Sequence, residues 1–335
     1  MSKLGIGVIG LGRMGRVYGS FVAAQLDEAK LVAVSDAQES VLEHYTGVRT
    51  YREYAALLTD PDVQAVIVTT PTHTHREIVV AAANAGKAIF CEKPTALSLR
   101  ETDLMLEAVN RAGVPFQVGF MRRFDRAYVE AKRQIDAGVI GQPVMIRSIG
   151  RDPFRTSLEY ANPAVSGGLI VDMGIHDFDV VRWLMNDEVE RVYTEVASLV
   201  YPELTTVGDV DNAQIALRFA GGGLGNIEVS RTAKYGYDIR AEIVGTDGTL
   251  QVGYLQETAV LTMTQAGVRH DVVPHFPQRF GPAYTAQIAA FAQSVREDKP
   301  PMVTAQDARA ALQAAIAATR SQHGGTPVMV RDVAD

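Results

Sequence analysis

The feature that most constrains the fold is a glycine-rich turn between two short apolar strands. Ile6–Ile9 predicts a strand, Gly10–Gly15 (GLGRMG) follows it, and a second strand over Leu31–Val34 ends close to Asp36. A strand, a glycine turn, a helix and an acid about 20 residues further on are together typical of a dinucleotide-binding βαβ unit. The sequence therefore predicts a Rossmann-type fold in the first part of the chain.

Each glycine of this turn has a separate physical role. Gly10 permits the tight turn, Gly12 lets the backbone come close to a pyrophosphate, and Gly15 lets the helix pack tightly on the strand. The N-terminus of the helix offers N–H groups and a positive dipole end to the phosphates. We therefore assign the whole turn, including Arg13 and Met14, to cofactor binding.

Asp36 indicates which dinucleotide the turn would bind. Its carboxylate can accept hydrogen bonds from both hydroxyls of an adenosine ribose, and it would repel a 2′-phosphate. An NADP site usually has an arginine nearby, whereas Ala37, Gln38 and Glu39 come next here. NAD is therefore favoured over NADP, although FAD and S-adenosylmethionine use similar loops. The simplest alternative is a tight turn that binds nothing.

Length and composition exclude several other classes of protein. The 335 residues suggest two domains, and a net charge of −7 gives no support to nucleic-acid binding. No apolar run approaches the roughly 20 residues that span a bilayer, and no signal peptide is expected. The only cysteine is Cys91, so no disulfide framework exists and a cytoplasmic location is expected.

The period of the sequence changes near residue 120. Residues 1–120 alternate strands and helices, which predicts an NAD-binding domain with a doubly wound parallel sheet. Residues 121–335 contain β runs with few helices between them, which predicts an α+β domain for substrate binding and oligomerisation. Its sheet should be large, mostly antiparallel and open on one face, and we expect another subunit to cover that face.

The predicted elements are as follows. In the first domain, further strands are expected at Ala65–Thr69, Ala88–Cys91 and Phe116–Phe120, with helices at Glu39–Tyr45, Glu53–Leu58, His75–Ala85 and Leu99–Ala112. In the second domain, strands are expected at Val144–Ile149, Val192–Val200, Ala213–Phe219, Leu224–Ala233, Ile239–Val244 and Thr258–Met263. Helices there are expected at Phe124–Ala137, Gly174–Met185, Tyr284–Arg296 and Ala305–Ser321, and hairpin turns at Gly221–Gly223 and Thr246–Gly248.

Two groups of residues are candidates for catalysis. Lys93, which stands between Glu92 and Pro94 after an expected parallel strand, would project from a stiff strand end into the ligand crevice. Asp172 and His176 are spaced i, i+4, so in a helix they share one face, as would Asp179 at i+7. A histidine beside carboxylates is suited to take a proton near neutral pH. A solvated lysine and a helix cap with a solvated face are the simpler alternatives.

Other polar residues fit less specific roles. His73 and His75 could suggest metal ligands, but too few further ligands stand at suitable spacing, so no metal site is expected. The stretch Thr69–Arg76, which contains these histidines, fits better as a loop that follows a parallel strand and lines the nucleotide crevice. The pair Arg122-Arg123 could meet anionic groups or hydroxyls.

Together these residues resemble the glucose–fructose oxidoreductase and inositol dehydrogenase (Gfo/Idh/MocA) family over essentially the whole chain. The Rossmann turn, Thr69–His73, Glu92-Lys93-Pro94 and Asp172-x-x-x-His176 carry the resemblance, and Glu-Lys-Pro in this position is quite specific to the family. The stretches that look like its myo-inositol 2-dehydrogenase branch are Gly119–Asp125, Arg151–Pro153, Gly167–Leu169, His176–Asp179 and Tyr235–Asp238.

The resemblance implies an activity and a site. The activity would be reversible oxidation of a secondary alcohol of a cyclic polyol, myo-inositol or a close relative, with NAD as hydride acceptor. The implied catalytic residues are Lys93, Asp172 and His176. The NAD-binding residues would be Gly10, Gly12, Arg13, Met14, Gly15, Asp36, Thr69, Thr70, Pro71, His75, Glu92 and Lys93. The substrate-binding residues would be Arg123, Asp152, Asp172, His176 and Tyr235. A homotetramer through the open sheet face is also implied.

Three other functions stay open at this point. The first is an NAD-dependent dehydrogenase or reductase of an aldose or a deoxy-inositol. The second is a redox-neutral NAD-dependent glycosidase, since a transient ketone can drive elimination. The third is a non-catalytic sensor of NAD and sugar, for which a degraded catalytic set would be expected, whereas here Lys93, Asp172 and His176 are all present.

Overall fold

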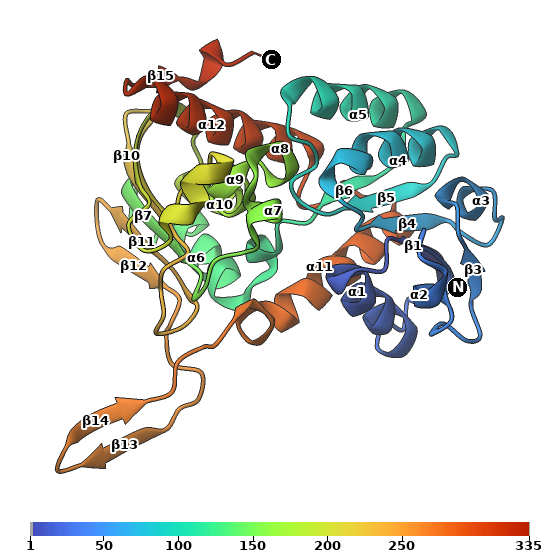
Figure 1. Ribbon diagram of the computed structural model, residues 1–335, viewed down its shortest axis with the longest axis horizontal. Helices are drawn as coiled ribbons and strands as arrows, with labels where there is room; N and C mark the ends of the chain where they lie inside the picture. The colour runs from blue at the N-terminus through green and yellow to red at the C-terminus, as the bar shows by residue number, and fades with distance from the viewer. Residues whose placement is uncertain (1–2, 335) are drawn as a thin grey trace. The chain divides into compact units, whose positions relative to one another are not determined.

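The alternation of strands and helices at the start of the chain produces one parallel sheet. The computed structural model describes residues 3–334, and its chain divides into two units (Figure 1). The first unit comprises the residues up to Met121 together with Tyr284–Arg309, and the second comprises Arg122–Ala283 and Ala310–Ala334. The expected division at residue 120 thus left out Tyr284–Arg309, a segment of the first unit.

The sheet of the first unit has the strand order β3-β2-β1-β4-β5-β6, and every pair in it is parallel. Its strands are β1 (Leu4–Ile9), β2 (Ala29–Ser35), β3 (Arg49–Tyr51), β4 (Ala65–Val68), β5 (Ala88–Cys91) and β6 (Phe116–Val118). All residues of β1, β4, β5 and β6 are buried, as expected for strands covered on both faces. The predicted doubly wound parallel sheet is confirmed.

Helices follow the strands of this sheet. They are α1 (Arg13–Ala24), α2 (Glu39–Leu42), α3 (Tyr54–Leu58), α4 (Thr72–Asn84) and α5 (Leu99–Ala112). The later part of α11 (Phe276–Glu297) also belongs to this unit, and it adds Ile288 and Phe291 to the same hydrophobic core as Tyr18 and Phe90. Phe90 contacts both aromatic partners, with ring centroids 5.5 Å from Tyr18 and 6.0 Å from Phe291. The core of the first unit is therefore built from both ends of the chain.

The second unit contains a sheet with the order β12-β11-β7-β10-β9-β8-β15, in which β7 and β10 form the one parallel pair between described strands. Its strands are β7 (Pro143–Arg151), β8 (Val189–Ala197), β9 (Asn212–Phe219), β10 (Leu224–Ser230), β11 (Asp238–Gly245), β12 (Thr249–Val252) and β15 (Val328–Met329). The predicted large, mostly antiparallel sheet is confirmed, as are the turns at Gly221–Gly223 and Thr246–Gly248, which join antiparallel neighbours.

One face of this sheet is covered and the other is open. Along β9, Ile215 and Leu217 are buried, whereas the alternating residues Gln214, Ala216 and Arg218 are exposed. Such strict alternation is typical of a strand with one solvated face. On the covered face α10 (Ile175–Met185) packs against β7. The prediction that this sheet is open on one face is therefore confirmed.

The remaining elements of the second unit connect the strands. They are α6 (Arg126–Asp136), α7 (Leu158–Ala161), α8 (Pro163–Ser166), α9 (Gly168–Asp172), α12 (Ala305–Gly324, shared with the first unit) and short 3-10 helices at Met121–Phe124, Pro202–Val207 and Val330–Asp332. Strands β13 (Leu261–Thr264) and β14 (Gly267–His270) form a hairpin that stands apart from the seven-stranded sheet (Figure 1). No helix within residues 3–334 is long and apolar enough to cross a membrane.

Candidate active site

The glycine turn after β1 has a backbone that other residues would not fit. Gly10 has a φ of +88°, in the left-handed region that favours glycine. A Cβ added to Gly15 would lie 1.9 Å from the carbonyl oxygen of Gly10, so helix α1 can approach the turn only because Gly15 lacks a side chain. An added Cβ at Gly12 would meet nothing within 4 Å, so the backbone there borders open space. The tight turn at Gly10 and the close helix packing at Gly15 are as expected, and the pyrophosphate contact of Gly12 stays a prediction.

Helix α1 begins directly after this open backbone. Gly12 is its N-cap residue, no side chain caps the helix, and no acidic residue stands in its first turn. Arg13 and Met14 are the first residues of the helix. The positive end of the helix dipole and the first-turn N–H groups therefore face no carboxylate of their own helix, which suits a phosphate group.

Asp36 is fixed at the end of β2 by two backbone donors. The N–H of Leu11 donates to its Oδ2 at 2.7 Å, and the N–H of Gln38 donates to its Oδ1 at 2.9 Å. A carboxylate offers about four acceptor positions, so each oxygen keeps one more. The side chain is partly exposed. Asp36 is therefore anchored against the glycine turn with acceptor capacity left for the two hydroxyls of a ribose.

The loop after β4 closes against the same turn. The hydroxyl of Thr69 donates to the carbonyl of Gly10 at 2.6 Å, and the hydroxyl of Thr74 donates to that of Thr70 at 2.7 Å. Pro71 is the N-cap residue of α4. The predicted nucleotide-lining loop thus contacts the glycine turn within the first unit.

His75 lies behind this loop. It is 1% exposed, and its ring nitrogens face two backbone carbonyls, Nε2 that of Thr70 at 2.8 Å and Nδ1 that of Pro94 at 3.0 Å. Burial lowers the pKa of His75, which favours the neutral ring. The ring lies between the loops after β4 and β5, and because a neutral imidazole carries one N–H it donates to one of the two carbonyls.

Lys93 follows β5, where the sequence predicted it. Glu92 before it accepts hydrogen bonds from the hydroxyl of Tyr18 and, at 3.1 Å, from the N–H of Lys93. Burial raises the pKa of Glu92, while the hydrogen bond from Tyr18 and the charge of Lys93 lower it. Pro94 follows in a cis peptide bond. Lys93 is partly exposed. It follows the carboxyl end of β5, and the hydrogen bonds of Glu92 fix the backbone there.

Asp172 and His176 lie on successive helices of the second unit. Asp172 is the last residue of α9, and His176 lies in the first turn of α10. Met173 and Gly174 join the two helices. The expected single helix from Gly174 therefore begins at Ile175. The two joining residues keep right-handed helical dihedral angles, so the chain continues in helical sense across the i, i+4 spacing.

The carboxylate of Asp172 is held by two side chains of the same unit. The hydroxyl of Tyr160 donates to Oδ1 at 3.2 Å, and Nη2 of Arg231 donates to Oδ2 at 3.3 Å. Arg231 is 2% exposed and also donates to Asp209 at 2.6 Å. A buried guanidinium shared by two carboxylates fixes the position of Asp172.

Helix α10 is anchored by two buried ion pairs. Arg122 donates to Asp177 at 2.6 Å, and Arg123 donates to both oxygens of Asp179 at 2.9 and 2.6 Å. Asp179 was predicted to share a helix face with His176. It is 1% exposed, and its carboxylate forms the ion pair with Arg123. Arg123 is bound in the same pair, so its predicted contact with a polyol stays a prediction.

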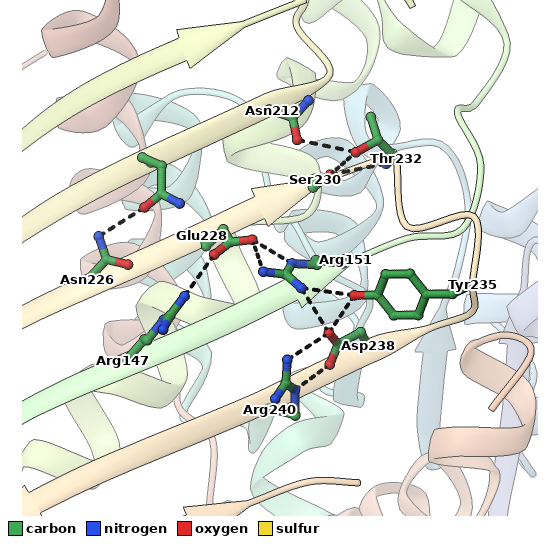
Figure 2. A network of polar contacts seen from close by, with 11 residues as sticks. Arg147, Arg151, Asn212, Asn226, Glu228, Ser230, Thr232, Tyr235, Asp238 and Arg240 are labelled. Carbon is green, nitrogen blue, oxygen red and sulfur yellow. Dashed lines mark hydrogen bonds and ion pairs between the residues drawn. The ribbon is translucent and has the colours of Figure 1, made fainter. Parts of the chain in front are cut away.

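Tyr235 and Asp152 lie at one end of the seven-stranded sheet. The hydroxyl of Tyr235 donates to Asp238 at 2.7 Å and accepts from Arg151 at 2.9 Å, as part of a polar network on the open face (Figure 2). Asp152 is joined to the loop that carries Tyr235, since the N–H of Ala233 donates to its carbonyl at 3.0 Å. Their predicted role as polyol contacts stays a prediction.

Three residues of these surroundings had no signal in the sequence. Tyr18 donates to Glu92, which is 74 positions away in the chain, and Arg231 donates to Asp172, which is 59 positions away. Gln287 donates to Tyr18 across 269 positions. Local spacing does not report contacts of this kind. Across the described part of the chain, no group of three or more His, Cys, Asp or Glu side chains could hold a metal ion.

Comparison with protein families and with known proteins gives consistent matches. Residues 4–120 match the family model described as "Oxidoreductase family, NAD-binding Rossmann fold", and residues 132–330 match "Oxidoreductase family, C-terminal alpha/beta domain". The chain is 41% identical to scyllo-inositol 2-dehydrogenase (NAD(+)) of Bacillus subtilis over 327 residues, 96% of this chain and 95% of that protein. It is 39% identical to myo-inositol 2-dehydrogenase of Thermotoga maritima over 333 residues, covering 98% and 99% of the two chains.

A solved structure is similar over the same length. Scyllo-inositol dehydrogenase of Lactobacillus casei, solved with bound NAD(H) and scyllo-inositol, superposes with a TM-score of 0.94 at 30% identity. The match covers 98% of this chain and 100% of that chain. The sequence matches and the structural match therefore cover both units of the chain.

Proposed function

Because the chain belongs to the Gfo/Idh/MocA oxidoreductase family and is an NAD-dependent dehydrogenase, we propose that its substrate is a cyclic polyol, myo-inositol or a stereoisomer such as scyllo-inositol. One secondary alcohol becomes a ketone. The observation that carries this proposal is the similarity to inositol 2-dehydrogenases at 39–41% identity over nearly the full chain.

The glycine turn and Asp36 fit the cofactor. Gly12 leaves room for a pyrophosphate, the start of α1 faces it with N–H groups, and Asp36 keeps acceptor positions for the ribose hydroxyls. Thr69, Thr70 and Pro71 belong to the loop closed against this turn. NAD+, when bound, supplies the hydride acceptor.

We propose that Lys93, Asp172 and His176 carry out catalysis. A ring nitrogen of His176 takes the hydroxyl proton of the substrate. The Nζ of Lys93 donates a hydrogen bond to the same oxygen and stabilises its developing negative charge. Asp172, held by Tyr160 and Arg231, orients these groups or a neighbouring hydroxyl.

The direct test is a spectrophotometric assay. Purified protein and NAD+ are mixed with a panel of inositol isomers, aldoses and glycosides, and NADH absorbance is followed. Formation of NADH with an inositol supports the proposal. NADH with an aldose alone would move the assignment to a sugar dehydrogenase, release of sugar from a glycoside without net NADH would favour a glycosidase, and NAD binding without any turnover would favour a sensor.

Substitutions test the assigned residues. Lys93→Ala and His176→Ala should each lower kcat by roughly 100-fold or more, with little change in NAD affinity. Lys30→Ala and His44→Ala are the matched controls, because both side chains are exposed and belong to neither candidate group. Full activity of the Lys93 or His176 variant would reject the assignment of that residue.

We also infer a homotetramer formed through the open face of the seven-stranded sheet. Two large apolar side chains, Met145 and Leu224, are neighbours on that face and are 47% and 49% exposed. Their exposure favours a covered face. Light scattering on a sizing column should give four copies, and Met145→Glu should lower that number. Leu104→Glu on α5, where Leu104 is 40% exposed, is the control.

The expected cytoplasmic location has one supporting observation. Cys91 is free and fully buried at the end of β5, so the fold uses no disulfide. We therefore propose a reducing compartment, and fractionation of the source cells would test it.

A further inference from the structure

We propose that Tyr18 is a positioning residue for the reaction and acts through Glu92 to fix the backbone that carries Lys93. The inference rests on the proposed function, since it assumes that Lys93 is catalytic. All residues involved belong to the first unit, and none of the roles assigned above uses Tyr18.

A series of hydrogen bonds links Gln117 to Lys93 and converges on the carboxylate of Glu92. The side-chain amide of Gln117 donates to the backbone carbonyl of Gln287 at 2.9 Å, and the amide of Gln287 donates to the hydroxyl of Tyr18 at 2.8 Å. Tyr18 then donates to Oε1 of Glu92, and the other oxygen of that carboxylate accepts the N–H of Lys93 at 3.1 Å. The amide next to the catalytic side chain is therefore tied to α1 and α11.

The burial of this series of hydrogen bonds makes it rigid. Tyr18, Gln117 and Gln287 are each 0% exposed, so no water competes for their hydrogen bonds. Burial raises the pKa of Tyr18 well above its usual value, so the phenol keeps its proton and remains a donor. A neutral phenol that donates to the partly buried carboxylate of Glu92 makes a charge-assisted hydrogen bond, which is stronger than a neutral one.

Gly119 gives this carboxylate its space. A Cβ added to Gly119 would lie 3.1 Å from the carboxyl carbon of Glu92 and from both of its oxygens. Real Cβ contacts are rarely that short, so an alanine at this position would push the carboxylate by a few tenths of an ångström. Gly119, which follows β6, therefore leaves the space that the carboxylate of Glu92 occupies.

The residue after Lys93 is held as well. The carbonyl of Pro94 faces Nδ1 of the buried His75 at 3.0 Å. Lys93 is therefore flanked by Glu92, which accepts its N–H, and by Pro94, whose carbonyl lies beside the buried ring of His75. A side chain with four rotatable bonds needs such a fixed base if its ammonium group is to reach one substrate oxygen repeatedly.

The test compares two variants that disturb Glu92 in different ways. Tyr18→Phe removes the donor without changing the ring, and Gly119→Ala displaces the carboxylate while leaving Tyr18 intact. Each should lower kcat for inositol oxidation by about 10- to 100-fold, because small misplacements near the reaction centre are costly. The KM for NAD+ and the dissociation constant of NAD+ should change far less than kcat, because the glycine turn and Asp36 are untouched.

The pH profile separates positioning from a loss of stability. The hydrogen bond from Tyr18 lowers the pKa of Glu92, so Tyr18→Phe should move the acid limb of the kcat profile to higher pH. Tyr54→Phe is the matched control, because Tyr54 makes the same kind of bond to Glu77 on the surface of this unit. The control should leave kcat and its pH profile unchanged.

A third variant distinguishes the possible failures. Combining Tyr18→Phe with Lys93→Ala should lower kcat no further than Lys93→Ala alone, because the tyrosine acts through the lysine. Wild-type kcat and pH profile in both Tyr18→Phe and Gly119→Ala, with Lys93→Ala inactive, would overturn this inference and leave the proposed function standing. A fully active Lys93→Ala variant, or a wild-type protein that oxidises no inositol, would overturn both.

Discussion

The buried ion pair between Arg122 and Asp177 should be among the most sensitive positions of the second unit. Asp177 is 0% exposed and accepts hydrogen bonds from Arg122 and from the hydroxyl of Ser148, both at 2.6 Å. In Asp177→Ala the guanidinium of Arg122, itself 3% exposed, remains buried without this partner. Removal of one member of a buried pair costs about 3–5 kcal/mol, because the charge left behind is still desolvated.

This free energy converts into a measurable change in Tm. In a unit of this size each kcal/mol shifts Tm by about 2–4 °C, so Asp177→Ala should lower Tm by about 6–20 °C in differential scanning calorimetry. Asp136→Ala is the matched control, because that carboxylate is 53% exposed in its pair with Lys132. A surface pair contributes about 0–1 kcal/mol, and an acid at a helix C-terminus opposes the helix dipole.

A double substitution sharpens the test. Arg122→Met combined with Asp177→Leu removes both charges and keeps apolar volume, so it should recover most of the lost Tm. If Asp177→Ala lowers Tm no more than Asp136→Ala does, the pair is not desolvated and the reasoning from burial is wrong.

Three further predictions follow from the first unit. Gly15→Ala should abolish NAD binding in isothermal titration calorimetry, because its Cβ would lie 1.9 Å from a backbone oxygen of the turn, and unchanged affinity would contradict the close packing of α1. Asp36→Asn should weaken NAD binding by about 10-fold, through loss of charge-assisted hydrogen bonds to the ribose, while NADP binding weakens less; equal losses for both cofactors would argue against a ribose contact. Burial raises the pKa of Glu92 in the folded protein above its ordinary value of 4.5. The stability that the protonated carboxyl group contributes is therefore fully present below pH 4.5 and is lost as the pH rises through the folded pKa. The Tm of Glu92→Gln relative to wild type should therefore increase from acid to neutral pH in a thermal scan, and a constant difference would mean that the carboxyl group is solvated.

Elements with local signals at both ends could be predicted closely. Helix α5 has the bounds Leu99–Ala112 in both prediction and structure, because Ser98 caps it through the N–H of Glu101 at 3.2 Å and Gly113 ends it with a φ of +66°. Five of the six strands of the parallel sheet were equally clear from their apolar runs, whereas β3, with the sequence Arg-Thr-Tyr, was missed. Short exposed strands were not clear, and β14 was also missed because all four of its residues are exposed and none marks a buried face.

The residues proposed for catalysis have local sequence signals, whereas the residues that hold them in place do not. Lys93 and Asp172 stand out through local sequence, at a strand end and beside His176. Their supports depend on chain segments brought together by folding, such as Arg231 for Asp172 and Gln287 behind Tyr18. Arg123 shows the opposite case, since a motif suggested a ligand contact and the structure gives it a buried partner 56 positions away.

The return of the chain into the first unit also constrains biosynthesis. Ile288 and Phe291 belong to the same core as Tyr18 and Phe90, and they leave the ribosome almost last. A nascent chain of 120 residues would contain the glycine turn but would lack the α11 side chains that complete its hydrophobic core. Apolar surface would stay exposed, so this chain should bind chaperones or aggregate rather than fold. We therefore expect nucleotide binding to be acquired late in translation, and we expect a chain that ends before α11 to lack it.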